Sequence, residues 1–410
     1  MSVPMRSHVI CLLVLLCLTT CVSPAKLFDW SQWIDWERWI PASAVPETDS
    51  TLIKLAILHR HGERVAEHTF KNDLYPATDL KFWPDGEGQL TIKGKQRMLA
   101  VGKLIRKRYS QFLGENPINV YARSSPVDRC LTSAELVLAG AYPPTGRLVF
   151  DPDLDWQPIP VHTESEETEQ MLITPSKMRC PASNAAKALQ MTSPEVKSYD
   201  EENRRLLQRI SSYSGENISS VVQVHPVYDA LHIARENGRT LPNWVTNEMF
   251  DKLEEMDTKN YCINSSTPLI QKLDSGVFLH DLKQNFETTI TKDYVNKTVF
   301  FYSAHDSKLT PVMKSLGIFD GKNPGYGSSL LFELHHLQEG EQVVRVYHIS
   351  DTESGVVEKV ETRGCPAPPA ECDVDSFFQG LADFLTDEQT HAALCKDIPT
   401  IAVQPTDCFS

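Results

Sequence analysis

The residues best suited to chemistry form one short run, Arg60-His61-Gly62-Glu63-Arg64. A histidine between two arginines can attack a phosphoryl group, because guanidinium groups neutralise and orient its non-bridging oxygens. Nearby cations also lower the pKa of a histidine, so the ring stays unprotonated and nucleophilic in acid. This run therefore predicts a site that handles a phosphate anion.

Two further polar runs follow apolar segments in the same way. Arg123 follows residues 118–122, and His305-Asp306 follows residues 298–302. A second His-Asp pair, His280-Asp281, lies within an apolar stretch whose pattern is that of a helix or buried segment. We therefore favour His305-Asp306 as the pair that takes part in chemistry.

The elements that must position these residues are strands followed by helices. Residues 52–58, 118–122 and 298–302 are apolar runs typical of strands buried on both faces. Helical patterns follow over 91–113, from Pro126 toward Ala139, and up to Gly317. Residues 330–336 and 342–349 indicate a hairpin. In an open α/β sheet ligands bind at the carboxyl ends of the strands, so all three runs should meet at one edge.

The predicted fold is α/β, with a mixed, mostly parallel sheet flanked by helices and a helical insertion that caps the active site. We assign residues 51–162 and 293–410 to the catalytic core. Residues 163–292 form the cap, with helical patterns over 193–212, 228–237 and 243–257.

The N-terminus reads as a signal peptide over residues 1–25, with Arg6, a ten-residue apolar run and small residues near Ala25. The run is shorter than the roughly 20 residues that span a bilayer, and no later segment approaches that length, so we expect no membrane anchor. Residues 26–50 are rich in Trp, and we interpret them as a segment that packs on the domain through its indoles. A membrane-surface or partner-binding helix is the alternative. The tryptophans are Trp30, Trp33, Trp36 and Trp39.

The cysteines and glycosylation sequons indicate an oxidising compartment. Cleavage near Ala25 would leave seven cysteines, an odd number, so one should stay unpaired and the role of Cys408 is open. Cys365 and Cys372 bracket a short Pro-rich loop suited to a local bridge. The disulfide candidates are Cys130, Cys180, Cys262, Cys365, Cys372 and Cys395. The predicted glycosylation sites are Asn217, Asn264 and Asn296.

Composition and missing motifs exclude several other classes. The formal net charge of −14 among 410 residues argues against nucleic acid as a general partner. There is no CxxC or HExxH motif, so we expect no metal site and no cofactor. Asp151 and Asp153 resemble the start of a magnesium-dependent phosphatase, but an acidic surface turn explains them better.

The Arg-His-Gly-x-Arg run after an apolar strand resembles the signature of the histidine acid phosphatases. Residues 121–129 and 156–163 are similar to further segments of that family, and residues 302–306 match its third motif. The likeness runs from about residue 51 to Cys395, and is strongest to secreted animal acid phosphatases of the prostatic, lysosomal and insect-venom kind. Ala66 stands where the family usually has proline.

The resemblance implies a role for each matched residue. His61 would form a phosphohistidine, and Asp306 would protonate the leaving alcohol. The groups that would bind the phosphoryl oxygens are Arg60, Arg64, Arg123 and His305. It also implies a homodimer.

We therefore expect a secreted or lysosomal acid phosphatase that cleaves small phosphate monoesters without metal. A phytase-like or lysophosphatidate-type specificity is one alternative. A secreted binding glycoprotein that keeps the fold without turnover is the other.

Overall fold

The structure, a computed structural model, describes residues 50–287, 297–338, 340–396 and 407–409. The predicted signal peptide, the four tryptophans of the Trp-rich segment and Asn296 lie outside the described residues. Among the described helices, none is long and apolar enough to cross a membrane.

The core is one eight-stranded mixed sheet in the order β3-β2-β4-β1-β5-β6-β7, with β8 paired to β6. Strands β3, β2, β4 and β1 run parallel, whereas β5 to β8 pair antiparallel. The predicted mixed sheet is thus confirmed, and its parallel half carries the three polar runs. The strands are β1 (Leu52–Arg60), β2 (Val120–Ser124), β3 (Val161–His162), β4 (Val299–Ala304), β5 (Ser329–His336), β6 (Gln342–Ile349), β7 (Glu358–Val360) and β8 (Cys372–Asp373).

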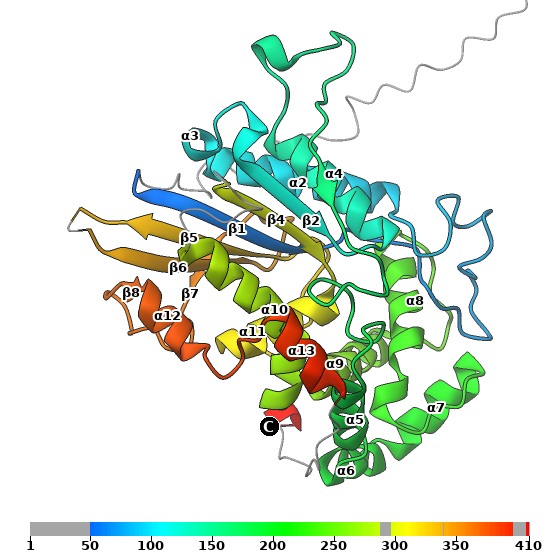
Figure 1. Ribbon diagram of the computed structural model, residues 1–410. Helices are drawn as coiled ribbons and strands as arrows, with labels where there is room; N and C mark the ends of the chain where they lie inside the picture. Colours follow the sequence, from blue (N-terminus) through cyan, green and yellow to red (C-terminus); the bar gives the residue numbers. More distant parts are fainter. Residues whose placement is uncertain (1–49, 288–296, 339, 397–406, 410) are drawn as a thin grey trace, which may run out of the picture. The chain divides into compact units, whose positions relative to one another are not determined.

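Helices cover both faces of this sheet (Figure 1). The helices are α2 (Ile92–Arg108), α3 (Ser110–Leu113), α4 (Asp128–Ala141), α5 (Pro181–Gln190), α6 (Pro194–Glu202), α7 (Arg204–Ser214), α8 (His225–Glu236), α9 (Asn247–Ile263), α10 (Pro268–Glu287), α11 (Asp306–Leu316), α12 (Val374–Gly380) and α13 (Glu388–Lys396). Helices α2 and α4 lie on one face, and α10, α11 and α12 on the other.

Alternation along β1 explains this three-layer packing. Leu55 and Ile57 join the core beneath α2 and α4, whereas Ala56 and Leu58 pack under α10 and α11. Successive side chains of a strand point to opposite faces, so a run that is apolar throughout buries both.

Helices α5 to α9 lie between β3 and β4 in sequence, within the predicted cap. Residues of α7, α8 and α9 share a separate apolar core with the loop after β1. The helix predicted over 193–212 is broken at Asn203 into α6 and α7. Helix α10, although inside the predicted cap segment, packs against the sheet through residues such as Phe278.

Three disulfides join the described cysteines, and one of our candidates is wrong. Cys365 pairs with Cys372, as the short loop indicated. Cys180 pairs with Cys395, and Cys262 with Cys408. Cys130 is free, because the other six described cysteines pair with one another; its buried Sγ lies 3.4 Å from the Ala304 carbonyl oxygen.

Candidate active site

Parallel register brings the three polar runs to one edge of the sheet. Arg60 at the end of β1 pairs with Ala304 at the end of β4, and Ser124 at the end of β2 pairs with Ser303. The backbone then continues in step, since the amide of His61 donates to the carbonyl of Ala304 at 3.0 Å. Residues that are far apart in the sequence therefore meet where these strands end.

A cavity of about 1150 Å³ opens at this edge. Four of the six predicted chemical residues line it, namely His61, Arg64, His305 and Asp306. Helix α5, helix α8 and the end of helix α9 supply much of the opposite wall. The cavity is thus bounded by the sheet edge on one side and by helices of the predicted cap on the other.

His61 has the protonation and tautomer of a nucleophile. Its side chain is 2% exposed, and its Nδ1 donates to the Gly62 carbonyl oxygen at 2.8 Å. Because a carbonyl can only accept, the proton sits on Nδ1 and the Nε2 lone pair is available. Burial lowers the pKa of His61 well below its usual value, and the nearby Arg129 and Arg60 lower it further. The ring therefore stays neutral even in acid.

Gly62 is needed for packing as well as for its place in the run. A Cβ there would lie 2.7 Å from the Gly94 carbonyl oxygen at the start of α2. The next residue, Glu63, is fully buried and accepts from Thr91 Oγ1 at 2.8 Å and from Asn237 Nδ2 at 3.0 Å. Glu63 therefore fixes the loop that carries His61, a role that the sequence pattern did not indicate.

Three arginines converge beside His61, and each is oriented by a carboxylate. Arg64 forms two hydrogen bonds with Asp229 of α8, at 2.9 and 3.3 Å. Arg129 in the first turn of α4 forms two with Glu67, at 3.0 and 3.1 Å. Among the described residues, the Nε groups of both arginines have no hydrogen-bond partner. Buried, unsatisfied donors of this kind suit an anion.

Arg60 is the third arginine of this cluster, and Asp306 is the carboxylate that orients it. Its guanidinium is 2.5 Å from the Asp306 carboxylate and donates to the Pro324 carbonyl oxygen at 2.7 Å. It also lies over the ring of Tyr326, 4.1 Å from the centroid. The nearly complete burial of Arg60 is thus compensated by an ion pair, a hydrogen bond and a cation–π contact.

Arg123 does not join this cluster in the described structure. Its guanidinium donates to Glu169 at 3.0 Å, and it is not among the described residues that line the cavity. Arg129, six positions later, lines the cavity and lies 3.4 Å from His305 Nδ1. The predicted phosphate ligand Arg123 is the first arginine of this segment, whereas the second, Arg129, is the one beside His61.

His305 and Asp306 open α11 at the same edge. Because Arg129 can only donate to His305 Nδ1, the His305 proton is on Nε2, which donates to Ser125 Oγ at 2.9 Å. The rings of His305 and His61 meet edge to face, with centroids 5.4 Å apart. Burial lowers the pKa of His305 well below its usual value, and Arg129 reinforces the effect. His305 is therefore a neutral hydrogen-bond donor.

Asp306 is held as a carboxylate in this state. Burial would raise its pKa, but Arg60, followed by His225 and Arg64, outweighs burial and holds the pKa below the usual value. The backbone amide of Ser307 also donates to its Oδ1 at 2.6 Å. Asp306 therefore binds a proton less readily than an ordinary aspartate does.

The described glycosylation candidates and the two alternative catalytic groups, His280-Asp281 and the acidic turn near Asp151, lie at different places. Asn217 is exposed, whereas Asn264 is half-buried and lines the cavity. His280-Asp281 lies on α10, where Asp281 accepts from Tyr302 Oη at 2.6 Å, outside the described lining of the cavity. The acidic residues from Asp151 to Asp155 form an exposed turn.

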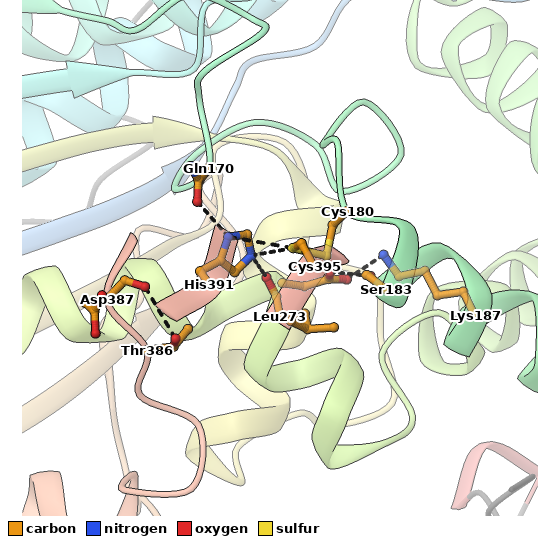
Figure 2. Close-up of a disulfide and its surroundings, with 10 residues drawn as sticks. Gln170, Cys180, Ser183, Lys187, Leu273, Thr386, Asp387, His391 and Cys395 are labelled. Carbon is orange, nitrogen blue, oxygen red and sulfur yellow. Dashed lines mark hydrogen bonds and ion pairs between the residues drawn. A yellow bond between two sulfur atoms is a disulfide. The ribbon is translucent and has the colours of Figure 1, made fainter. Parts of the chain in front are cut away.

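A buried His-Cys-Cys group lies apart from the cavity. Figure 2 shows His391 beside the disulfide of Cys180 and Cys395, with its ring nitrogens 2.7 Å from Gln170 Oε1 and 2.8 Å from the Leu273 carbonyl oxygen. Metal binding requires thiolates, and these two sulfurs are bonded to each other. The group therefore joins α5 to α13 as a structural element.

Comparison with known families identifies relatives over most of the chain. Residues 51–348 match the family described as Histidine phosphatase superfamily (branch 2). The Lysosomal acid phosphatase of Xenopus laevis is 32% identical over 311 residues, which cover 74% of this chain and 71% of the relative. The Prostatic acid phosphatase of Mus musculus is 32% identical over 307 residues, covering 73% and 79%.

Solved structures of similar fold include bacterial phytases. The apo form of the Hafnia alvei phytase has a TM-score of 0.65 at 19% identity, covering 85% of this chain and 99% of that one. The Citrobacter braakii phytase has a TM-score of 0.63 at 14% identity, covering 82% and 99%. At these identities the likeness shows the fold alone.

Proposed function

The chain belongs to branch 2 of the histidine phosphatase superfamily and is a phosphoric monoester hydrolase, and we propose that it acts through a phosphohistidine on His61. The observation that carries this proposal is the neutral His61 ring, whose Nε2 lone pair is available in a cavity lined by Arg64 and Arg129. The positive charge that the transferred phosphoryl group needs is supplied by arginines, so we propose a reaction without metal.

In the first step, His61 Nε2 forms a bond to phosphorus while the ester P–O bond breaks. Arg60, Arg64 and Arg129 hold the non-bridging oxygens, and the His305 Nε2–H turns from Ser125 Oγ to donate a hydrogen bond to one of them while keeping its proton. Protonated Asp306 gives its proton to the leaving alcohol. In the second step a water attacks phosphorus, the N–P bond breaks, and the Asp306 carboxylate takes the proton from that water.

The acid preference follows from the proton that Asp306 must carry. In the substrate-free site Arg60 keeps Asp306 ionised. A bound phosphate ester would compete for Arg60 and would place negative charge near the carboxylate, and both effects raise the pKa of Asp306. Acid then completes the protonation, while the arginines keep His61 unprotonated. We therefore expect activity to rise as the pH falls toward mild acid.

Hydrolysis of p-nitrophenyl phosphate with and without EDTA, and of an alkyl phosphate across pH, tests this function directly. The parent should be active in acid and insensitive to EDTA, and His61→Ala should lose activity. An inactive parent would favour the non-catalytic binding glycoprotein. Loss of activity in EDTA would instead support a metal-dependent reaction.

A phytase-like specificity is the second candidate, favoured by the size of the cavity. A volume of about 1150 Å³ exceeds what a single phosphate needs, and Lys177 and Lys187 line it in addition to the arginines. One structure of similar fold is the Hafnia alvei phytase in complex with myo-inositol hexakis sulphate. Comparing kcat/KM for phytate, lysophosphatidate and p-nitrophenyl phosphate discriminates between these specificities.

We also propose that the protein is exported or delivered to lysosomes. The three disulfides of the described chain support an oxidising compartment. The relatives named above are lysosomal and prostatic acid phosphatases. The homodimer implied by the family resemblance stays a prediction.

A further inference from the structure

The cavity is also lined by a histidine that takes no direct part in the proposed chemistry. His225 is the first residue of α8, and it lines the same cavity as His61 and Asp306. Its Nδ1 lies 2.7 Å from the Asp257 carboxylate. Its Nε2 forms no hydrogen bond with the described residues, and its side chain is 32% exposed. One donor position of this ring is thus open toward a ligand.

The carboxylate that orients His225 is itself fixed. Asp257 lies on α9 with a side chain that is 3% exposed. One of its oxygens contacts His225, and the other accepts from Asn323 Nδ2 at 2.9 Å. The ring of Tyr261 meets the imidazole edge to face, with centroids 5.6 Å apart. Such supporting contacts hold a functional side chain in one orientation.

The same support ties His225 to the reaction centre. Asn323 holds Asp257, and the next residue, Pro324, accepts a hydrogen bond from Arg60. Tyr326 of this segment lies against the Arg60 guanidinium. One short segment between α11 and β5 therefore contacts both Arg60, which pairs with Asp306, and Asp257, which pairs with His225.

Every acidic group around His225 favours its charged form. Asp257 faces it from α9, Asp229 from its own helix and Asp306 from α11. Burial opposes the charge, but these carboxylates, Asp257 above all, raise the pKa of His225 to about 9. The ring is therefore an imidazolium at the acidic and neutral pH at which a phosphatase of this kind would work.

We propose that His225 is a specificity residue whose Nε2–H binds an anionic oxygen on the leaving group. The preferred substrates are then phosphate esters whose alcohol carries a second acidic group, a carboxylate or another phosphate. A hydrogen bond from an imidazolium to an anionic oxygen is stronger than one to a neutral hydroxyl. This inference rests on the proposed phosphatase function, since it concerns which ester that function accepts.

The test compares substrates that differ in one group. 3-Phosphoglycerate carries a carboxylate where glycerol 3-phosphate carries a neutral hydroxymethyl group. Propane-1,3-diol bisphosphate and its monophosphate provide the corresponding phosphate pair. The parent should show a higher kcat/KM for the acidic member of at least one pair, and the pair that shows it identifies the group. Both members of a pair release a primary alcohol of the same kind, and the value for the bisphosphate is divided by two because it carries two equivalent esters.

Variants of His225 separate its charge from its shape. His225→Gln should lower the preference for the acidic substrate by about 10- to 100-fold, mainly through KM, because a charged hydrogen bond is lost. His225→Lys keeps a cation and should restore part of the preference. His336→Gln is the matched control, since His336 is exposed at the end of β5 far from the site. It should leave the ratio unchanged.

Asp257→Asn tests the charge of His225 through the pH dependence of the substrate preference, which a purely structural role of His225 would not change. Without the carboxylate the pKa of His225 should fall, so the preference should disappear as the pH rises from 5 to 8. In the parent it should persist to about pH 9. Equal kcat/KM for both members of each pair, or an equal effect of His225→Gln on both, would overturn the inference. A parent inactive on p-nitrophenyl phosphate would overturn the proposed function itself.

Discussion

At the scale of single residues, the contact between Arg60 and Asp306 decides when a proton is available. The two groups are 2.5 Å apart, and the pair keeps Asp306 ionised in the substrate-free site. Protonation of the acid is therefore linked to the arrival of a phosphate that competes for Arg60. Asp306 would therefore gain its proton mainly when a phosphate ester is bound.

Asp306→Asn keeps the shape of this side chain but cannot give a proton. Turnover of an alkyl phosphate should fall by about 10²- to 10⁴-fold, the usual contribution of general acid catalysis. The kcat/KM for p-nitrophenyl phosphate should suffer much less, because it reports the phosphorylation step and this leaving group departs without a proton. Steady-state kinetics on both substrates measures the difference, with inhibition by inorganic phosphate as the control for binding. Near-normal turnover of the alkyl ester would rule out this role for Asp306.

Arg129 and Arg123 offer a matched pair on one segment. Arg129→Lys should lower kcat/KM for p-nitrophenyl phosphate by about 10- to 100-fold, because lysine cannot reproduce the fork geometry at the phosphate. Arg123→Lys should change it by less than about threefold, since Arg123 is engaged with Glu169. The reverse order of effects would restore Arg123 to the phosphate-binding role that sequence analysis gave it.

At the scale of elements, the strand ends were predictable, and so were some helix starts, such as those of α2 and α6. A strand buried on both faces is apolar throughout, so its end is marked by the first polar residues, as in β1, β2 and β4. The hairpin of β5 and β6 was predicted for a similar reason. Because β1 and β4 are parallel neighbours, their ends place His61 and His305 close together.

Arg123 was chosen as a phosphate ligand because it follows directly after the strand of residues 118–122. Arg129 lies in the first turn of α4, which begins at Asp128, within two residues of the predicted start at Pro126. Its place beside the cavity depends on how α4 packs against the sheet, and the sequence pattern does not specify that packing. His225 was missed for another reason, because its role depends on Asp257, which lies on a different helix.

The ion pair between Arg64 and Asp229 connects the loop after β1 to α8. The pKa of Asp229 is lowered to about 2, since Arg64 and then His225 outweigh the effect of burial. A depressed carboxyl pKa stabilises the folded state above the usual value of the group, and this contribution is lost only as the pH falls through about 2. The connection should therefore stay intact in mild acid, where we expect the enzyme to work.

Asp229→Asn would leave the Arg64 charge buried without its partner. We expect a loss of about 3–5 kcal/mol in the free energy of unfolding. Urea unfolding should show a similar loss at pH 5 and at pH 7, because both lie above the pKa window of Asp229. Asp85→Asn, which removes a more exposed pair with Lys95, should cost less than about 1 kcal/mol. A loss that vanished at pH 5 would contradict the assigned pKa.

At the scale of the whole molecule, the disulfides differ strongly in the length of chain they close. Cys180 and Cys395 are 215 positions apart, whereas Cys365 and Cys372 are 7 apart. In the chain-entropy account the long bridge is worth about 5 kcal/mol and the short one about 2 kcal/mol. These pairings across distant elements could not be predicted from spacing, whereas the local one could.

Replacing each pair with alanine tests this difference. The Cys180→Ala/Cys395→Ala variant should lose clearly more stability than Cys365→Ala/Cys372→Ala in thermal and urea unfolding at the same pH. Cys130→Ala provides the control, because it removes a cysteine without removing a bridge. Equal losses for the two double variants would show that native-state strain or residual structure, and not loop length, dominates.

The bridge between Cys262 and Cys408 fastens a residue close to the end of the chain onto α9. Asp257 and Tyr261, which hold His225 in place, lie within the last two turns of the same helix. Reduction of this bridge would release the fastening. The selectivity of the enzyme for acidic leaving groups would then depend on the redox state of its surroundings, and the same chain would prefer different substrates in oxidising and reducing compartments.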